Sequence, residues 1–212
     1  IYPHELISQC FDYDNAFHLS RRGEFAYYIG LDFALSAQAA SDYTVYTIIE
    51  KGGNLCRVVN IERYKGLGYQ SQKHRIVQLA EIFKPVRILA DEGSFGKSFI
   101  ADLLAAYLPI EGFKFTNQSK QELHTSLRNM FEQKRIIINM NQEDLKTKTL
   151  TTHLVKELES FGIVWDEKKG LVKFEGTGEH DDMVTSLALA AYAARGMGNI
   201  SWNILRGASA KK

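Results

Sequence analysis

Acidic residues end two short apolar segments, and an acidic pair opens a third apolar segment near the end of the chain. Asp32 lies in FAYYIGLDFA and Asp91 ends VRILAD. Asp181 and Asp182 begin the segment DDMVTSLALAAYA. Carboxylates that meet in one cleft repel one another unless a cation lies between them. Such oxygen ligands suit Mg²⁺ or Mn²⁺, and two of these ions about 3.5–4 Å apart can promote phosphodiester hydrolysis. The four aspartates are therefore candidate metal ligands and catalytic residues.

Any one of these aspartates, taken alone, could be only a helix cap or a helix-start charge that the helix dipole favours. The metal hypothesis therefore requires that they meet. On the last helix, Asp181 lies three and seven residues before the apolar Val184 and Ala188. This spacing favours Asp181 as the residue that points toward the sheet, with Asp182 more to the side. His180 could orient a carboxylate, contact a phosphate, or simply stand at the helix entry.

The segment GSFGKS, residues 93–98, offers a different chemistry, that of a phosphate-binding loop. The P-loop pattern G-x-x-x-x-G-K-[ST] requires a glycine five residues before Gly96, but Asp91 stands there. The glycine at 93 leaves the arc of backbone N–H groups two residues short, and the carboxylate would repel a phosphate. We therefore expect Gly93 and Gly96 to let the loop pack closely beside a metal site. A nucleotide-binding module built on Lys97 remains the alternative.

The secondary structure expected around these residues is an alternation of strands and helices. Pro85 ends one helix, and Ser119 followed by Glu122 forms a capping box that predicts the start of another. Strands are expected at 25–34, in two segments around Gly52-Gly53 within 43–64, and at 86–91, 112–116, 135–140 and 162–176, where the last is a hairpin. Helices are expected at 68–85, 94–108, 119–135, 144–161 and 180–196.

This order predicts an α/β fold with one mixed sheet. Three strands joined by hairpins form an antiparallel set, and later strands arrive through helical crossovers as parallel additions. Helices then cover both faces of the sheet, and an extra β-hairpin precedes the last helix. Open α/β sheets hold their sites at the carboxyl ends of their strands. Asp32 and Asp91 would therefore lie side by side if their strands are neighbours.

The composition limits the class of protein. The chain has 212 residues, of which 45% are hydrophobic and 24% charged, with a formal net charge of +1. We expect one sizeable core and no overall basic field, so nucleic acid would bind a local patch. Cys10 and Cys56 predict two reduced thiols. No apolar run reaches the ~18 residues of a membrane span, and no signal peptide is recognised. With Ile as its first residue, the chain is expected to be an excised domain.

Several motifs, in their order, resemble the RNase H-like nuclease domain of the large terminase subunit of tailed bacteriophages. They are IGLDFA, ILADEGSFGKSFIADLL, KFTNQSKQELHTSLRNMFEQKRIIIN, the hairpin GIVWDEKKGLVKFEG, and HDDMVTSLALAAYA. The resemblance covers about residues 25–195. It implies an RNase H-like sheet and a DNA endonuclease that cuts concatemeric double-stranded DNA at the initiation and termination of packaging. It also implies two Mg²⁺ or Mn²⁺ ions held by Asp32, Asp91 and Asp181, with Asp182 adjacent.

The resemblance further implies a domain organisation and a set of partners. Residues 1–22 would be a linker remnant from a preceding ATPase motor domain, 23–200 the nuclease domain, and 201–212 a C-terminal tail. Portal and small terminase subunit are expected partners in the cytoplasm of an infected host cell, and no membrane is expected. DNA would bind through its backbone, largely without sequence preference. The candidate contacts are Lys120 of the Ser-Lys step, Lys97, Arg128, Lys168 and Lys169.

Two further hypotheses remain at this stage. Junction resolvases, transposases and integrases also use RNase H-like carboxylate sites, and they would differ in DNA substrate and partners. The other hypothesis is a noncatalytic DNA-binding or scaffold domain with a decayed site. The presence of all the acidic residues argues against it.

Overall fold

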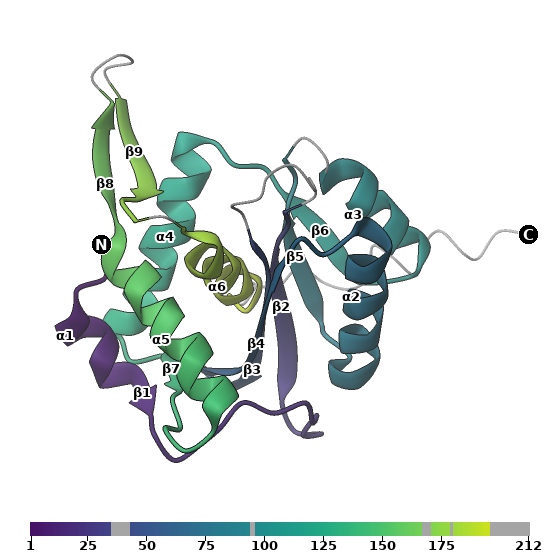
Figure 1. Cartoon of the computed structure of the whole chain (residues 1–212), viewed down its shortest axis with the longest axis horizontal. Coiled ribbons are helices and arrows are strands. Elements are labelled where there is room, and N and C mark those ends of the chain that lie inside the picture. Colours follow the sequence, from purple (N-terminus) through teal and green to yellow (C-terminus); the bar gives the residue numbers. More distant parts are fainter. Residues whose placement is uncertain (35–42, 94–95, 167–170, 179, 196–212) are drawn as a thin grey trace, which may run out of the picture.

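A seven-stranded mixed sheet forms the centre of the computed structural model, which describes residues 1–34, 43–93, 96–166, 171–178 and 180–195 (Figure 1). The strand order is β1-β7-β4-β3-β2-β5-β6, and β8 and β9 form a separate hairpin. The strands are β1 (Phe11–Asp12), β2 (Ala26–Asp32), β3 (Tyr43–Gly52), β4 (Leu55–Lys65), β5 (Arg87–Asp91), β6 (Ile110–Phe113), β7 (Ile136–Asn139), β8 (Phe161–Asp166) and β9 (Leu171–Gly176). The helices are α1 (His4–Ile7), the 3₁₀ helix η1 (Ser8–Cys10), α2 (Tyr69–Phe83), α3 (Gly96–Ala105), α4 (Asn117–Glu132), α5 (Leu145–Ser160) and α6 (Asp182–Ala193).

The pairing of the strands confirms the predicted mixed sheet. Strands β2, β3 and β4 are antiparallel neighbours. Strands β5, β6 and β7 pair in parallel with β2, β5 and β4 respectively. Each of these three parallel strands follows a helical crossover, which is the connection that parallel pairing requires.

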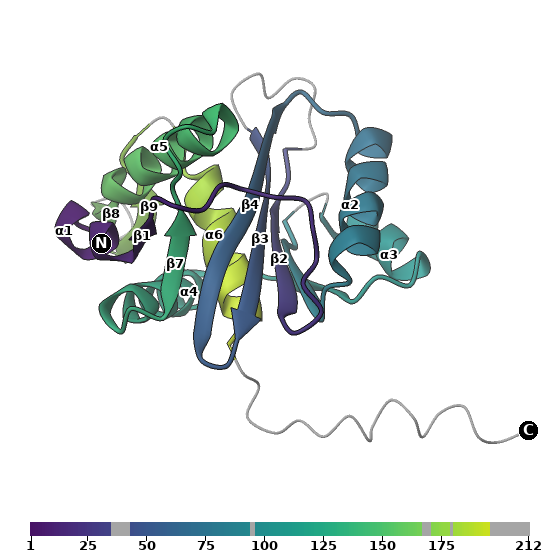
Figure 2. The ribbon, with the colours of Figure 1, turned by 90° about the horizontal axis from the view of Figure 1, so that it is seen from below.

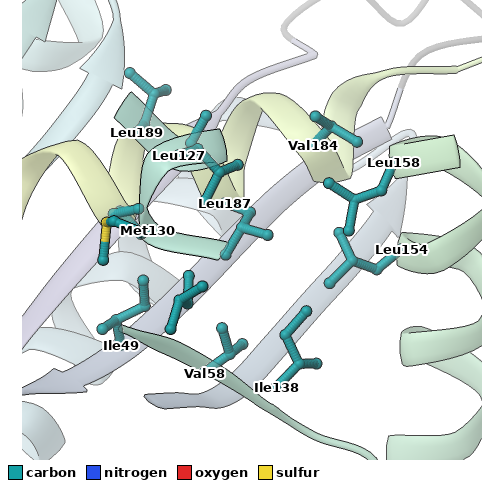
Figure 3. Close-up of a cluster of buried hydrophobic side chains, with 14 of the residues drawn as sticks. Ile49, Val58, Leu127, Met130, Ile138, Leu154, Leu158, Val184, Leu187 and Leu189 are labelled. Atoms are coloured by element: carbon teal, nitrogen blue, oxygen red, sulfur yellow. The ribbon is translucent and has the colours of Figure 1, made fainter. Parts of the chain in front are cut away.

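Helices cover both faces of the sheet. Figures 1 and 2 show α2 and α3 on one face and α4, α5 and α6 on the other. Buried apolar residues form one cluster on each side, so the sheet separates two cores. Figure 3 shows part of the larger cluster, where residues of α4, α5 and α6 converge over the strands. Helix α6 is buried along nearly its whole length, between the sheet and the outer helices.

The starts of α4 and β6 differ from the sequence-based expectation. Helix α4 begins at Asn117, and its cap is Thr116, whose hydroxyl accepts a hydrogen bond from Ser119 N at 3.1 Å. The predicted cap at Ser119 is therefore wrong, because the Ser119 side chain is the second half of the capping box and accepts from Thr116 N at 2.8 Å. The strand expected at 112–116 lies earlier, at Ile110–Phe113, where it pairs with β5.

The first residues of the chain pack onto the larger core. Tyr2, Ile7 and Cys10 are buried in it, and β1 pairs in parallel with β7 at one edge of the sheet. The division into a linker at 1–22 and a nuclease domain at 23–200 stays a prediction, and the expected tail at 201–212 lies outside the described residues. In the described part of the chain, no helix combines the length and apolar character needed to cross a membrane.

Candidate active site

Asp32 and Asp91 end neighbouring parallel strands. In the register of β2 and β5, Leu31 stands opposite Ala90. Each aspartate follows its paired residue directly, so the two stand side by side at the carboxyl edge of the sheet, where neighbouring strands are about 4.8 Å apart. The sequence-based expectation that these two strands are neighbours is confirmed.

Helix α6 brings the second acidic pair to the same edge. Strand β2 and helix α6 touch at Gly30 and Ser186, where the Ser186 hydroxyl donates a hydrogen bond to Gly30 O at 2.9 Å. Asp182 lies one helical turn before Ser186, and Asp32 lies two residues after Gly30 in the same direction. Residues four apart share a helix face, and residues two apart share a sheet face. Asp182 is therefore carried toward Asp32.

Asp181 stands just before the helix and not within it. It is the N-cap residue of α6. Its Oδ2 lies 3.6 Å from Lys120 Nζ and accepts a hydrogen bond from Gly176 N of β9 at 3.3 Å. The helical spacing that favoured Asp181 over Asp182 does not apply, because the helix begins at Asp182. The face that meets the sheet contains Asp182 and Ser186, whereas Val184 belongs to the core among the helices (Figure 3).

The electrostatics of the site indicate that Asp91, Asp181 and Asp182 all act on Asp32. The pKa of Asp32 is raised well above its usual value, first by burial and then by repulsion from Asp182, Asp91 and Asp181. Burial also raises the pKa of Asp91, although a hydrogen bond from Gly93 and the positive charge of Lys120 lower it in part. The positive charge of Lys120 opposes the rise in the Asp32 pKa as well. This lysine of α4 is the nearby cation that partly balances the acidic group.

His180 and Tyr43 flank Asp182. The Asp182 Oδ2 accepts a hydrogen bond from Tyr43 N at 3.4 Å and lies 3.7 Å from His180 Nδ1. The His180 ring packs edge-on against Tyr43, with the ring centroids 5.0 Å apart. His180 therefore lies where it can orient a carboxylate, which is one of the roles that the sequence left open.

The glycines of GSFGKS pack against Asp91. Gly93 N donates to Asp91 Oδ1 at 2.9 Å, and a Cβ on Gly93 would lie 3.1 Å from Asp91 Oδ2. A Cβ on Gly96 would lie 2.2 Å from Asp91 O, so no side chain fits there. Residues 94 and 95 lie outside the described residues. Close approach of the chain to Asp91 thus accounts for both glycines without a phosphate.

The predicted DNA contacts are distributed unevenly around the acidic group. Lys97 is 76% exposed, lies 3.7 Å from Glu92 Oε1, and borders a cavity of about 460 Å³ together with Asp91. Arg128 lies two turns beyond Lys120 on α4, where it binds Glu132 and the main-chain oxygen of Ile1. Arg128 is thus placed with the N-terminal segment, away from the carboxylates. Lys168 and Lys169 lie outside the described residues.

One lysine beside the carboxylates was not predicted. Lys114 borders the same cavity as Asp91 and Lys97. It follows directly after Phe113 of β6, which stands opposite Asp91 in the register. The rule that placed Asp32 and Asp91 at the carboxyl edge would have placed Lys114 there too, had the strand been located at Ile110–Phe113.

The sequence also offered no reason to single out Glu157, a buried acid beneath the start of α6. Its Oε2 accepts a hydrogen bond from Met183 N at 2.8 Å, and its Oε1 lies 3.5 Å from Arg63 Nη2. Burial raises its pKa to about 7, against the hydrogen bond from Met183 and the charge of Arg63. Neither residue lies in a motif, and β4 and α5, which carry them, are far apart in the sequence.

The chemistry of the acidic group fits a divalent cation. In the described part of the chain, the half-buried Asp32 carboxylate has neither a hydrogen bond nor an ion pair, although three other carboxylates repel it. An acid in this position is stabilised in its charged form by a cation held among hard oxygen ligands. Within the described ranges, however, no three side chains of His, Cys, Asp or Glu already stand close enough together to hold a metal.

Comparisons with known proteins agree with this geometry. The family model described as Terminase RNaseH-like domain matches residues 29–193. Among solved structures, the chain is similar to the large terminase nuclease from thermophilic phage G20c with bound magnesium, at 22% identity and a TM-score of 0.68 over 82% of this chain and 84% of that one. It is also similar to the large terminase nuclease domain of Thermus phage P74-26, at 22% identity and a TM-score of 0.66 over 86% and 87%.

A longer structure also matches. A large terminase from another thermophilic bacteriophage, solved in complex with ADP, is 18% identical, with a TM-score of 0.60 over 92% of this chain. The match covers 45% of that longer chain. A comparison with curated proteins finds no match. The shared fold is the RNase H-like sheet that the motifs implied.

Proposed function

The chain belongs to the family of terminase RNase H-like domains, and we propose that it is the metal-dependent endonuclease domain of a viral terminase large subunit. In this role it cuts concatemeric double-stranded DNA at the initiation and termination of packaging. The observation that carries the proposal is the meeting of four aspartates, from β2, β5 and the start of α6, at one edge of the sheet.

Divalent ions are the cofactor that this arrangement favours. The large terminase nuclease from phage G20c has been solved with magnesium, with cobalt and with zinc. In this chain, two Mg²⁺ or Mn²⁺ ions would be held by Asp32, Asp91, Asp181 and Asp182. When bound, such ions supply an activated water and stabilise the leaving oxygen of a phosphodiester. Their charge also relieves the repulsion that raises the pKa of Asp32.

The side chains around the aspartates have distinct tasks in this proposal. His180 holds Asp182 from the side of Tyr43. Lys120 neutralises part of the acidic charge. It lies 3.6 Å from Asp181, where it would contact a phosphate bound at the aspartates. Ser186 of α6 is buried against Gly30 of β2, and its hydrogen bond to Gly30 O keeps the helix at a fixed distance from the strand.

The DNA backbone would pass over the cavity beside Asp91. Lys97 and Lys114 border it, and phosphate contacts of this kind position a duplex without reading its sequence. On the other side, the hairpin β8–β9 projects from the body of the domain (Figure 1). Its base touches the site, since a Cβ on Gly176 would lie 2.9 Å from Asp181 Cβ. Lys168 and Lys169 of the hairpin remain proposed contacts.

The family supports a proposal for the wider assembly. The longer phage terminase binds ADP in its solved complex, and this chain matches less than half of its length. We propose that residues 1–22 follow an ATPase motor domain, and that the portal and small subunit are partners in the host cytoplasm. This chain would then cut DNA that the motor delivers.

The test is cleavage of supercoiled plasmid in Mn²⁺ by the wild type and by four variants, Asp32→Asn, Asp91→Asn, Asp181→Asn and Asp182→Asn. We expect Asp32→Asn and Asp91→Asn to abolish cleavage, because each removes a charged ligand without changing the shape. The control is Asp14→Asn, an exposed acid of the N-terminal segment, which should cut like the wild type. Full activity of Asp32→Asn and Asp91→Asn would refute the assignment.

A second substrate separates the proposal from an RNase H-like junction resolvase. A four-way junction and a linear duplex of the same length are offered together with Mn²⁺. A terminase nuclease should cut both at similar rates, because its contacts follow the backbone of an ordinary duplex. A strong preference for the junction would favour the resolvase hypothesis.

A further inference from the structure

We propose that Glu157 and Arg63 are positioning residues for the acidic pair Asp181-Asp182, a role that rests on the proposed function. Glu157 lies on α5 and Arg63 on β4, and neither belongs to the carboxylate group at the sheet edge. Glu157 contacts the start of α6 at Met183 N, and Arg63 contacts Tyr43 of β3, which lies beside Asp182. The proposed metal ligands Asp181 and Asp182, at the start of α6, are thereby held in place before any ion binds.

The first contact is a hydrogen bond to the end of the helix. Glu157 Oε2 accepts from Met183 N, the residue next to Asp182, at 2.8 Å. The first N–H groups of a helix lack partners within it, and here a carboxylate from another helix supplies one. Asp181 is the N-cap, but its side chain makes no capping hydrogen bond and is directed to Lys120 and Gly176. Glu157 therefore performs the capping and leaves Asp181 available to the site.

The second contact leads from Glu157 through Arg63 to Tyr43, whose main chain contacts Asp182. The guanidinium lies 3.5 Å from Glu157 Oε1 and packs over the ring of Tyr43, 3.6 Å from its centroid. The main-chain N–H of Tyr43 donates to Asp182 Oδ2. The ion pair between Glu157 and Arg63 thus acts on Asp182 through two neighbours. Glu157 binds the helix backbone at Met183, and Arg63 packs on the strand residue Tyr43.

The burial and incomplete hydrogen bonding of this ion pair argue against a purely stabilising role. Both side chains are nearly buried, at 11% and 8% exposed. Glu157 Oε1 and Arg63 Nε are buried without a hydrogen-bond partner. The desolvation of two buried charges with incomplete hydrogen bonding can exceed the energy that their attraction returns, and unsatisfied groups in a core often mark a functional constraint. The benefit here is the placement of the α6 start, comparable to residues that orient metal ligands in other proteins.

The experiment measures Mn²⁺ binding by isothermal titration calorimetry, together with hydrogen exchange at the Met183 amide. Glu157→Ala should raise the Kd for Mn²⁺ by about tenfold or more, the usual effect of losing a residue that orients a ligand. It should also speed exchange at Met183. Glu157→Gln keeps an oxygen acceptor for Met183 N, so it should bind Mn²⁺ within about threefold of the wild type and provides the rescue.

The matched control is Asp144→Ala, which removes an acidic cap from the other end of α5. Asp144 Oδ1 accepts from Thr147 N at 2.7 Å, far along the helix from Glu157. This variant should lose about 1 kcal/mol of stability and keep the Mn²⁺ affinity of the wild type.

Two outcomes overturn the proposal, and they are distinct. If Glu157→Ala, or the similarly sized Glu157→Met where the alanine variant does not fold, keeps both wild-type Mn²⁺ binding and wild-type exchange at Met183, the positioning role is wrong and the nuclease assignment stands. If the wild type binds no Mn²⁺ and cuts no DNA, the proposed function fails and this inference fails with it.

Discussion

Replacing Gly30 by alanine should move Asp181 and Asp182, at the start of α6, away from Asp32 and Asp91 on the sheet. Gly30 is where β2 and α6 come closest, and a Cβ there would lie 2.0 Å from Ser186 O and 2.4 Å from Ala190 N. Both atoms belong to the helix backbone, so no side chain can rotate away. Ordinary contact begins at 3.4 Å, so the helix must retreat by about 1.4 Å.

The energetic cost follows from this displacement. The hydrogen bond from Ser186 to Gly30 O, now 2.9 Å, would lengthen beyond hydrogen-bonding range. Losing a buried hydrogen bond costs about 1–3 kcal/mol and overpacking about 1–3 kcal/mol. Replacing a strand glycine returns about 0.5–1 kcal/mol. The free energy of unfolding should therefore fall by about 1–5 kcal/mol, which lowers the Tm by about 2–20 °C for a domain of this size.

Urea denaturation and Mn²⁺ titration calorimetry test this prediction together. Gly30→Ala should also weaken Mn²⁺ binding, because Asp182 moves with α6 while Asp32 stays on β2. Gly23→Ala is the control: a Cβ there meets nothing within 4 Å, so stability should change by less than about 0.5 kcal/mol. The double variant Gly30→Ala/Ala190→Gly should not recover, since the clash is with backbone. Wild-type stability and Mn²⁺ affinity in Gly30→Ala would refute the close packing of α6 on β2.

Two further predictions concern α4. Burial, with help from Lys120 and the N-terminal ammonium, lowers the pKa of His124 to about 3 from 6.5, so the folded state favours the neutral ring. The stability that this provides is complete above pH 6.5 and is lost as the pH falls toward 3, by up to about 5 kcal/mol. Urea titrations at pH 7 and pH 4.5 should therefore show the wild type losing stability relative to His124→Gln, and a constant difference between the two would contradict the low pKa. Thr116→Ala should lower the unfolding free energy by about 1 kcal/mol, because it removes the cap of α4, whereas the exposed Gln118→Ala should change it little; equal stabilities in thermal unfolding would return the cap to Ser119.

Part of the candidate site follows from local sequence pattern. An apolar run that ends in an acid predicts a strand whose last residue lies at the sheet edge, and this holds for Asp32 and Asp91. The alternation of strands with amphipathic helices predicts parallel additions, which the pairing of β5 with β2 confirms. These inferences succeed because the direction of a strand and its edge are set by residues close together in the chain.

Other features depend on packing between distant segments. Helical periodicity favoured Asp181, but α6 is apolar on nearly every side, so its pattern does not reveal which face meets the sheet. The contact of Gly30 with Ser186 decides this, and it brings Asp182 to Asp32.

The amino-acid sequence by itself determined the family, the order of the elements from β2 onward and the acidic residues proposed for the candidate site. The tertiary structure decided how the start of α6 is held: Glu157 and Arg63 reach it from α5 and β4, and no spacing within one segment could have predicted that. The physical reason is that a strand or helix orients its own side chains, whereas the placement of one element against another depends on where backbones can touch and where buried charges find partners.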